Sequence, residues 1–311
     1  MTNLFHNISD ISSSPSISTL EENIKLFLDY ALLEIGGFIN INRPSSGAQT
    51  QGLHILNYVN DPAMLGRVWE SNKKDWVYET EVAYNGVSPN SPSGIYINDT
   101  FVPVTDTGPY SYKINYPLGR VVFNSPMSTS LKVEASYSYR YIQTYIPDNA
   151  PWFKEIQKQS FDKSQFQFFG DSFITANHRV QLPCIIIELA PRTILAPYEL
   201  GNVKNYITQD VLFHILTENT NKSKNIADLL LMQKDNTFNL LNLRKIAIDN
   251  LSDVDYIGQK NPNRQAYRLL SENINYITNK CIIKNSTING FSSLTSNLYS
   301  TLARWTIEIF P

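Results

Sequence analysis

The sequence predicts an α+β protein: an N-terminal helix, an antiparallel β-module of sandwich or open-barrel type, and a small C-terminal mixed-sheet α/β domain. Three patterns favour this class. Apolar residues recur at helical spacing near the N-terminus. Polar and apolar residues alternate across much of residues 95–146, and apolar strands flank one amphipathic helix after residue 179. Helices and strands that occupy separate parts of a chain are typical of α+β proteins.

The N-terminal part consists of an arm, a helix and a long connection. Residues 1–18 are polar and serine-rich, which predicts a flexible arm and not a signal peptide. Glu21 and Glu22 suit the first turn of a helix over Leu20–Ile35, and Gly36–Gly37 would end it. Its predicted apolar face consists of Leu20, Ile24, Phe27, Leu28, Ala31 and Ile35. The rest of residues 19–72 carries loop signals and is either a surface connection or a loop that packs on a partner.

Residues 73–146 are predicted to form the β-module, with five or six strands. Trp76–Tyr84 alternates like a strand and Asn85–Gly86 marks a turn. Asn98–Asp99 forms a second turn, and Pro103 favours an edge strand. Tyr116–Gly119, with Pro117 at the second turn position, predicts a hairpin.

The last strand of this module has the clearest pattern. One face should carry Leu131, Val133, Ala135, Tyr137, Tyr139 and Tyr141. The other face should carry Lys132, Glu134, Ser136, Ser138 and Arg140. Because side chains alternate along a strand, this pattern predicts a half-buried strand with its charged face in solvent.

A linker with a short helix, residues 147–178, leads to an α+β domain over residues 179–311. Val180–Leu189 and Asp210–Leu216 are predicted buried strands. Asn221 or Ser223 would cap a helix. Its apolar face would hold Ile226, Leu229, Leu230 and Met232. A final strand would place Trp305, Ile307 and Ile309 opposite Arg304, Thr306 and Glu308.

Composition argues against several classes of protein. The 26 basic and 28 acidic residues give a net charge of -2, so sequence-specific nucleic-acid binding is not expected. No apolar run approaches the length of a membrane span, which predicts a soluble protein. The two cysteines do not form a disulfide framework, and Cys184 lies in an apolar run as a small buried hydrophobe. A reducing compartment fits this usage.

No residue pattern predicts catalysis. The chain lacks a phosphate-binding glycine loop, a Gly-x-Ser-x-Gly elbow, His-Glu-x-x-His and Cys-x-x-Cys. The four histidines are scattered, and His214 inside a strand suits a core or interface residue. Glu79 and Glu81 share the predicted exposed face of a strand. A hard cation there is possible in principle, but a solvated face fits better. We expect no enzyme, cofactor or metal, although a pocket that gathers Glu79, Glu81 and further acids would favour a hydrolase.

Tyrosine is the one enrichment that points to an interaction, with 18 residues in the chain. Those of the β-module either stabilise the sheet by cross-strand pairing, form a protein interface, or offer a platform for sugars. The candidate partner interface consists of Tyr110, Tyr112, Tyr116, Tyr139 and Tyr141.

Several segments together resemble a family of virion structural proteins. They are NIKLFLDYALLEIGGF, VWESNKKDWVYET, SYKINYPLGRVVFNSPMSTSLKVEASYSYRYIQTY, QLPCIIIELAPRT and QDVLFHILTEN. They are similar to a poorly characterised structural protein of contractile-tailed marine and cyanobacterial bacteriophages. The element order of the second domain also resembles the fold of tail terminators.

This resemblance implies a non-enzymatic virion component, assembled in the host cytoplasm. It would form a homo-oligomeric ring, a hexamer, at the head–tail junction as a neck or tail-terminator protein. Its partners would be other neck, tail-tube or sheath proteins. The alternative is a tail-fibre or baseplate adaptor that binds protein or glycan partners. Because fold analogy does not establish function, the position in the particle stays open.

Overall fold

The computed structural model describes residues 17, 19–44, 52–158, 167–169, 172–174, 179–197, 205–295 and 297–310. The chain divides into two units. Unit 1 takes residues 1–29, 144–246 and 267–311, and unit 2 takes residues 30–143 and 247–266. The arm expected over residues 1–18 lies outside the described residues, apart from Ile17. The chain therefore leaves the β-module at residue 143 and returns to it at residue 247.

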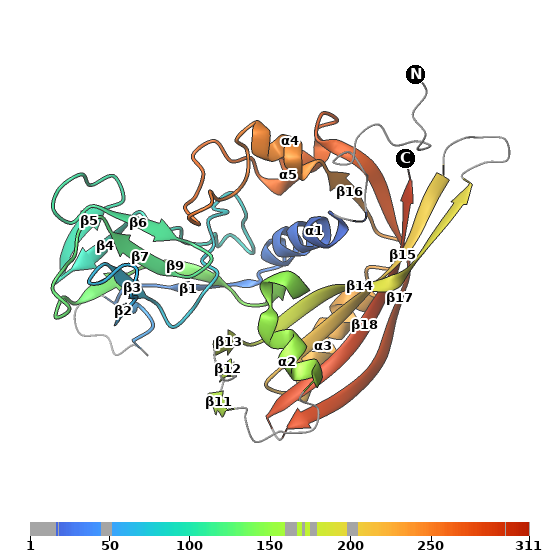
Figure 1. Ribbon diagram of the computed structural model, residues 1–311, viewed down its shortest axis with the longest axis horizontal. Helices are drawn as coiled ribbons and strands as arrows, with labels where there is room; N and C mark the ends of the chain where they lie inside the picture. Colours follow the sequence, from blue (N-terminus) through green and yellow to red (C-terminus); the bar gives the residue numbers. More distant parts are fainter. Residues whose placement is uncertain are drawn as a thin grey trace. The chain divides into compact units, whose positions relative to one another are not determined.

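Unit 2 contains a seven-stranded sheet in the order β5-β4-β8-β2-β3-β7-β6 and a two-stranded sheet β1-β9 (Figure 1). The strands are β1 (Phe38–Ile41), β2 (Ile55–Val59), β3 (Val68–Glu70), β4 (Gly94–Ile97), β5 (Thr100–Pro103), β6 (Tyr112–Asn115), β7 (Arg120–Phe123), β8 (Val133–Ala135) and β9 (Tyr137–Arg140). All their pairings are antiparallel. The expected loop before residue 72 thus contributes three strands, and the module begins earlier than residue 73.

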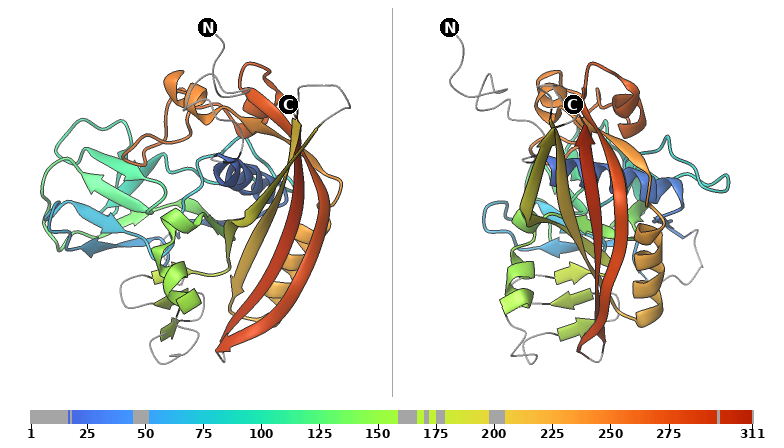
Figure 2. Two further views of the ribbon diagram at one scale, coloured as in Figure 1. Left: turned by 45° about the vertical axis from the view of Figure 1, so that its right-hand side comes forward. Right: turned by 90° about the vertical axis from the view of Figure 1, so that its right-hand side faces the viewer.

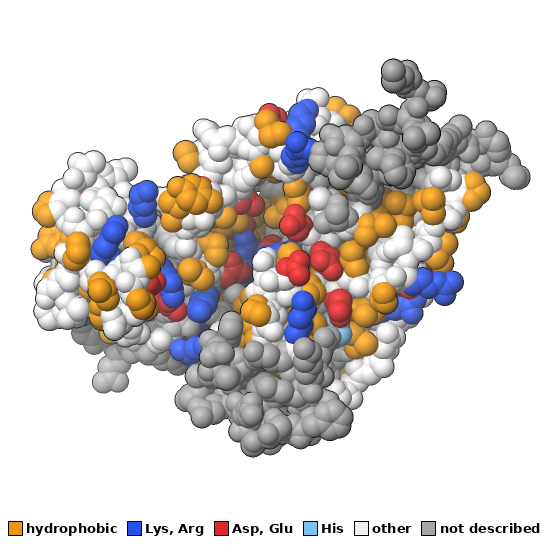
Figure 3. Space-filling model, in the orientation of Figure 1, with side chains coloured by type: hydrophobic (Ala, Val, Ile, Leu, Met, Phe, Trp, Pro, Cys, Tyr) orange, Lys and Arg blue, Asp and Glu red, His pale blue; other side chains and the backbone are white. Residues whose placement is uncertain are grey.

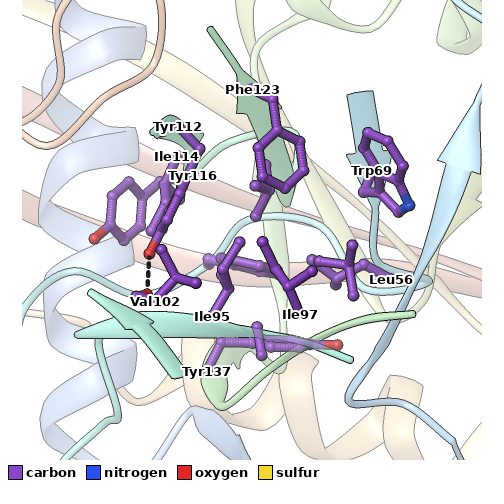
Figure 4. Close-up of a cluster of buried hydrophobic side chains, with 14 of the residues drawn as sticks. Leu56, Trp69, Ile95, Ile97, Val102, Tyr112, Ile114, Tyr116, Phe123 and Tyr137 are labelled. Carbon is purple, nitrogen blue, oxygen red and sulfur yellow. Dashed lines mark hydrogen bonds between the residues drawn. The ribbon is translucent and has the colours of Figure 1, made fainter. Parts of the chain in front are cut away.

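The core of unit 2 is rich in aromatic residues, and Figure 4 shows its side chains gathered in one cluster. Trp76 stacks on Tyr137 with ring centroids 4.3 Å apart, and Trp69 meets Phe123 edge-on at 5.0 Å. The Tyr112 hydroxyl donates to the Val102 carbonyl at 3.1 Å, which satisfies its buried polar end. These rings account for much of the tyrosine content of the module.

The predicted turns of the module are confirmed by their backbone angles. Asn98 and Asp99 both have positive φ, as do Asn85 and Gly86, which is the signature of a two-residue hairpin turn. Gly119 has φ +63°, and a Cβ there would lie 2.5 Å from the Lys73 carbonyl oxygen. β5, which ends at Pro103, is an edge strand as expected.

Two strand predictions are wrong in detail. Residues 76–84 form no continuous strand, since only Trp76 makes a bridge, to Tyr139, within that stretch before the turn at Tyr84. The long final strand expected over Leu131–Tyr141 is divided into β8 and β9, and a separate strand, β10 (Gln143–Tyr145), follows it. The face with Val133, Ala135 and Tyr137 is buried as expected.

Helix α1 (Leu20–Glu34) matches the predicted helix closely. It ends because Gly36 takes φ +85°, and the Gly37 N–H donates to the Leu32 carbonyl at 2.8 Å. Ile35 is 53% exposed, so it does not belong to the buried face. The division between the two units falls within this helix, after Asp29.

Unit 1 is built on a six-stranded sheet in the order β10-β14-β15-β18-β17-β16. Its strands after β10 are β14 (Cys184–Pro197), β15 (Asn205–Thr217), β16 (Thr237–Leu241), β17 (Ile277–Thr295) and β18 (Leu298–Phe310). Figure 2 shows β17 and β18, in red, as long strands that run side by side. A second sheet joins β11 (Gln167–Phe169), β12 (Ser172–Ile174) and β13 (Arg179–Gln181). The remaining helices are η2 (Pro147–Asn149), α2 (Pro151–Lys158), α3 (Thr220–Leu231), α4 (Leu243–Ile248) and α5 (Tyr267–Glu272).

The predicted final strand is confirmed in the middle of this sheet, where β18 pairs with both β15 and β17. Trp305, Ile307 and Ile309 are buried on one face. Helix α3 contacts β15, β17 and β18, and the Trp305 indole N–H donates to the Leu230 carbonyl at 2.9 Å. The α+β class is confirmed, with antiparallel pairing from β14 through β15, β18 and β17 to β16.

The predicted start and face of α3 need correction. Its N-cap is Asn219, whose side-chain oxygen accepts from the Lys222 N–H at 2.8 Å, and not Asn221 or Ser223. Ile226 and Leu230 are buried as expected, whereas Met232 is 80% exposed. Helix α3 ends at Leu231, one residue before Met232, so the apolar pattern in the sequence continues past the end of the helix.

Candidate interaction sites

The five tyrosines of the predicted partner interface do not share one surface. Tyr112, Tyr116 and Tyr139 are buried at 5–6% exposure in the core of unit 2, so they offer almost no area to a partner. Tyr141 is half-buried, and Tyr110 is 40% exposed. The sheet-stabilising interpretation therefore holds for the first three. Burial raises the pKa of Tyr112 and of Tyr116, as expected for phenols with little access to water.

Acidic residues of unit 2 gather around two arginines, and we call this group the acid–arginine cluster: Asp75, Glu79, Glu81, Asp253, Arg140 and Arg264. Glu79 is 4% exposed and pairs with Arg140. Arg140 also lies 3.5 Å from Asp75. The expectation of a solvated Glu79 is therefore wrong, because its charge is buried and neutralised inside the module.

Arg264 belongs to the returning segment 247–266 and holds the second half of this cluster. Its guanidinium binds both carboxylate oxygens of Glu81, at 2.8 and 3.1 Å, and its Nε lies 3.2 Å from Asp253. It also lies over the ring of Tyr78, 5.3 Å from the centroid. Burial raises the pKa of Asp253 to about 6, and the nearby charge of Glu79 adds to the rise. The cluster joins two distant segments by ion pairs, and every acid in it has a cationic partner.

The charged face of β8 and β9 is also buried, contrary to the prediction. Glu134 is 2% exposed and lies 2.9 Å from the Arg43 Nε, 3.2 Å from His54 and 3.1 Å from Lys132. Burial opposes ionisation of Glu134, but the hydrogen bonds from Arg43 and Lys132 prevail and lower its pKa. These contacts neutralise a carboxylate that alternation alone would place in water.

A polar pocket of about 410 Å³ lies in unit 2 and was not predicted from the sequence. It is lined by Asn42, Thr80, Pro89, Asn90, Ser91, Ser93, Gly94, Tyr96, Phe101 and Ser136. The sequence signal was the loop Ser88–Ser93, whose serine, proline and asparagine residues suggested only a connection.

The remaining candidate groups of unit 1, His214, Cys184 and Cys281, are half-buried or buried. The His214 Nε2 lies 2.8 Å from a Glu188 oxygen, and its ring packs on Phe153 at 4.8 Å. Burial lowers the His214 pKa and outweighs the opposing effect of its hydrogen bond to the Glu188 carboxylate. Cys184 and Cys281 are both buried and free, and burial raises both thiol pKa values. In the described segments, no three His, Cys, Asp or Glu side chains are grouped to hold a metal ion.

The long strands of unit 1 extend beyond their core. Residues 191–195 of β14 are exposed, including Ile194 at 43% and Leu195 at 63%. Phe291 of β17 is 50% exposed, and its neighbours from 289 to 293 are exposed as well. Figure 3 shows that hydrophobic side chains reach the surface in several places. Part of the apolar surface of unit 1 therefore lies on strand ends.

These features define an α+β protein with two units, an ion-paired module and a sheet with open edges. None of its described helices is both long and apolar enough to cross a membrane. Comparison with protein-family models, curated proteins and solved structures gave no significant match for the chain. Its function is therefore inferred from its own geometry.

Proposed function

We propose that the protein is a structural component of a tailed-phage virion that forms a ring at the head–tail junction, as a neck or tail-terminator protein. One observation carries the ring: among the described residues, the long strands β14 and β17 of the main sheet of unit 1 extend well past their outer neighbours. β14 has 14 residues, whereas its outer neighbour β10 has three. β17 has 19 residues, whereas its outer neighbour β16 has five and pairs only with Ile277–Ile282.

Open edges of this length favour pairing with another chain. An unpaired strand edge presents backbone N–H and C=O groups that another strand can bind. The apolar residues Ile194 and Leu195 lie on the outer part of β14, and Phe291 lies on the outer part of β17. Soluble monomers often protect such edges with charges or bulges. Both strands do have register shifts, one in β14 and three in β17, but these apolar side chains stay exposed. In this proposal the outer parts of both strands are covered by neighbouring copies.

The two edges differ, so contacts between them are heterologous. When the β14 edge of one copy meets the β17 edge of the next, the rotation per copy either closes a ring or gives a filament. The resemblance to tail terminators favours closure with six copies. In this proposal unit 2 decorates the ring or docks a neck, tube or sheath protein, and its acid–arginine cluster holds the module together rather than performing catalysis.

The test is the assembly state of the purified chain. We expect native mass spectrometry and electron microscopy to show a closed ring. Leu195→Lys and Phe291→Lys should each shift the mass towards the monomer, because a charge on an edge opposes strand pairing. Met232→Lys is the matched control, since Met232 is an 80% exposed apolar residue outside both edges. A wild-type chain that stays monomeric, alone and with neighbouring virion proteins, would refute the ring.

A further inference from the structure

We propose that the polar pocket of unit 2 is a binding site for a neutral saccharide, a mono- or disaccharide unit of a glycan. This inference does not rest on the ring proposal, because the pocket lies wholly within unit 2. Its volume of about 410 Å³ falls in the lower part of the range of small-molecule sites, about 300–1,000 Å³.

The side chains that line the pocket are neutral and mostly polar. Hydroxyl or amide groups come from Asn42, Thr80, Asn90, Ser91, Ser93 and Ser136. Each of these groups both donates and accepts hydrogen bonds, as do the hydroxyl groups of a sugar. A charged ligand would lose its hydration here without gaining an opposite charge, which is costly. The lining therefore favours a ligand rich in hydroxyl groups and without net charge.

Two aromatic rings form one side of the pocket. Tyr96 and Phe101 lie with centroids 5.2 Å apart, and Phe101 is 46% exposed. Gly94 allows this arrangement, because a Cβ there would collide with the Phe101 ring. The C–H groups of a sugar ring carry partial positive charge and pack on the electron-rich face of an aromatic ring. An exposed aromatic ring beside hydroxyl and amide groups therefore suits both the C–H groups and the hydroxyl groups of a pyranose.

The cation beside Tyr96 does not make the pocket a site for anions. The guanidinium of Arg43 lies 4.4 Å from the centroid of Tyr96. It is already paired with Glu134, at 2.9 Å, and with Asp99. Arg43 also does not line the pocket. Its role is to fix the ring of Tyr96.

The walls of the pocket are held before any ligand binds. The Asn90 N–H donates to the Ser138 hydroxyl at 2.6 Å, and the Asn90 amide donates to the Asn42 side chain at 2.8 Å. Ser91 and Tyr116 share a hydrogen bond of 3.2 Å between their hydroxyls. The Arg43 N–H donates to the Ser136 hydroxyl at 2.9 Å. A pre-organised site loses less conformational entropy on binding.

The inference is tested with the full chain and four probes: the methyl glycosides of glucose, galactose, mannose and N-acetylglucosamine. Saturation-transfer NMR and titration should show saturable binding of at least one glycoside. Tyr96→Ala, which removes a ring, and Ser93→Trp, which fills the pocket from an exposed position, should each weaken binding by about tenfold or more. Tyr110→Ala is the control, because it removes an exposed tyrosine of the same unit outside the pocket.

Circular dichroism checks that each variant folds. If Tyr96→Ala does not fold, the result for Ser93→Trp alone decides the test. Binding that is lost in the pocket variants and kept in the control supports the site. Absence of binding to all four glycosides overturns it. Binding that survives both pocket variants, or that Tyr110→Ala removes equally, overturns it as well.

Discussion

At the scale of single residues, the least expected feature is the burial of charge in unit 2. Glu79, Glu134 and Arg140 are all less than 5% exposed. Strand alternation assigned them to a solvent face. However, alternation shows only on which side of a strand a residue lies, and not whether another segment covers that side. In the structure, side chains from β1 and from segment 247–266 pair with residues that were expected to face solvent. Asn40 pairs with Ser138, and Arg264 pairs with Glu81. Those partners are far away in sequence, so no local pattern could reveal them.

The buried pair Glu79–Arg140 predicts a strong effect of a single substitution. Arg140→Leu would leave Glu79 buried without its main partner, which costs about 3–5 kcal/mol of unfolding free energy. Urea denaturation measures this loss. Adding Glu79→Gln to the same chain should restore part of the stability, because the unpaired charge is then absent.

The matched control for this pair is Arg268→Leu. Arg268 pairs with Glu272 at 3.9 Å, and both side chains are about two thirds exposed or more, at 68% and 70%. Its loss should cost no more than about 1 kcal/mol. Equal costs for the two arginine variants would show that the Glu79–Arg140 pair is not buried in solution.

Asp253 predicts how stability depends on pH. Because its folded pKa is raised from 3.8 to about 6, the folded state favours the protonated acid. The free-energy cost of ionising Asp253 in the folded protein is absent below the unfolded pKa. It grows as the pH rises between the unfolded and the folded pKa, and it is complete above about pH 6. Asp253→Asn lacks this penalty. The stability of the variant relative to wild type should therefore increase from about pH 4 to about pH 6.5.

Urea denaturation across this pH range measures the difference for Asp253→Asn. A difference for Asp253→Asn that is flat, or that falls with rising pH, contradicts the prediction.

At the scale of elements, local chemistry predicts turns and helix ends better than it predicts strand lengths. The turns at Asn85–Gly86, Asn98–Asp99 and Gly119 follow from residues that tolerate positive φ, so they need no distant partner. The cap of α3 was missed because Asn219, Asn221 and Ser223 are all acceptable cap residues. Only the path of the chain out of β15 selects the first of them.

The returning segment 247–266 is an element that the sequence did not predict, and Gly258 tests how it binds. Gly258 has φ +85°, and a Cβ there would lie 2.8 Å from the side chain of Asn115. Its carbonyl accepts from the Tyr116 N–H at 2.9 Å, and Asn115 donates to the Ile257 carbonyl at 2.6 Å. Gly258→Ala should therefore both strain the backbone and displace Asn115.

Gly86→Ala is the comparison for Gly258→Ala, because Gly86 has φ +78° and nothing within 4 Å of a Cβ. The backbone cost alone is about 1 kcal/mol. Urea denaturation should show a clearly larger loss for Gly258→Ala. Equal losses would mean that the segment does not contact Asn115 closely.

At the scale of the whole molecule, the sequence predicted the α+β class and the β18 strand, and it missed the division of the chain. The first part of unit 2 ends at residue 143. The segment 247–266 carries little periodicity and many polar residues, so nothing in its sequence set it apart from the domain predicted over residues 179–311. The polar pocket was missed for a related reason, since its lining comes from β4, β5 and several separate connections between strands.

The discontinuity of unit 2 has a consequence for how the protein is made. Residues 30–143 leave the ribosome first, yet Glu81 and Asn115 find their partners in residues 247–266. The β-module therefore stays incomplete until residues 247–266 have been translated, after all of residues 144–246. During that interval Asn115, at the end of β6, and the carboxylate of Glu81 lack these partners, and an incompletely folded nascent chain is prone to aggregation.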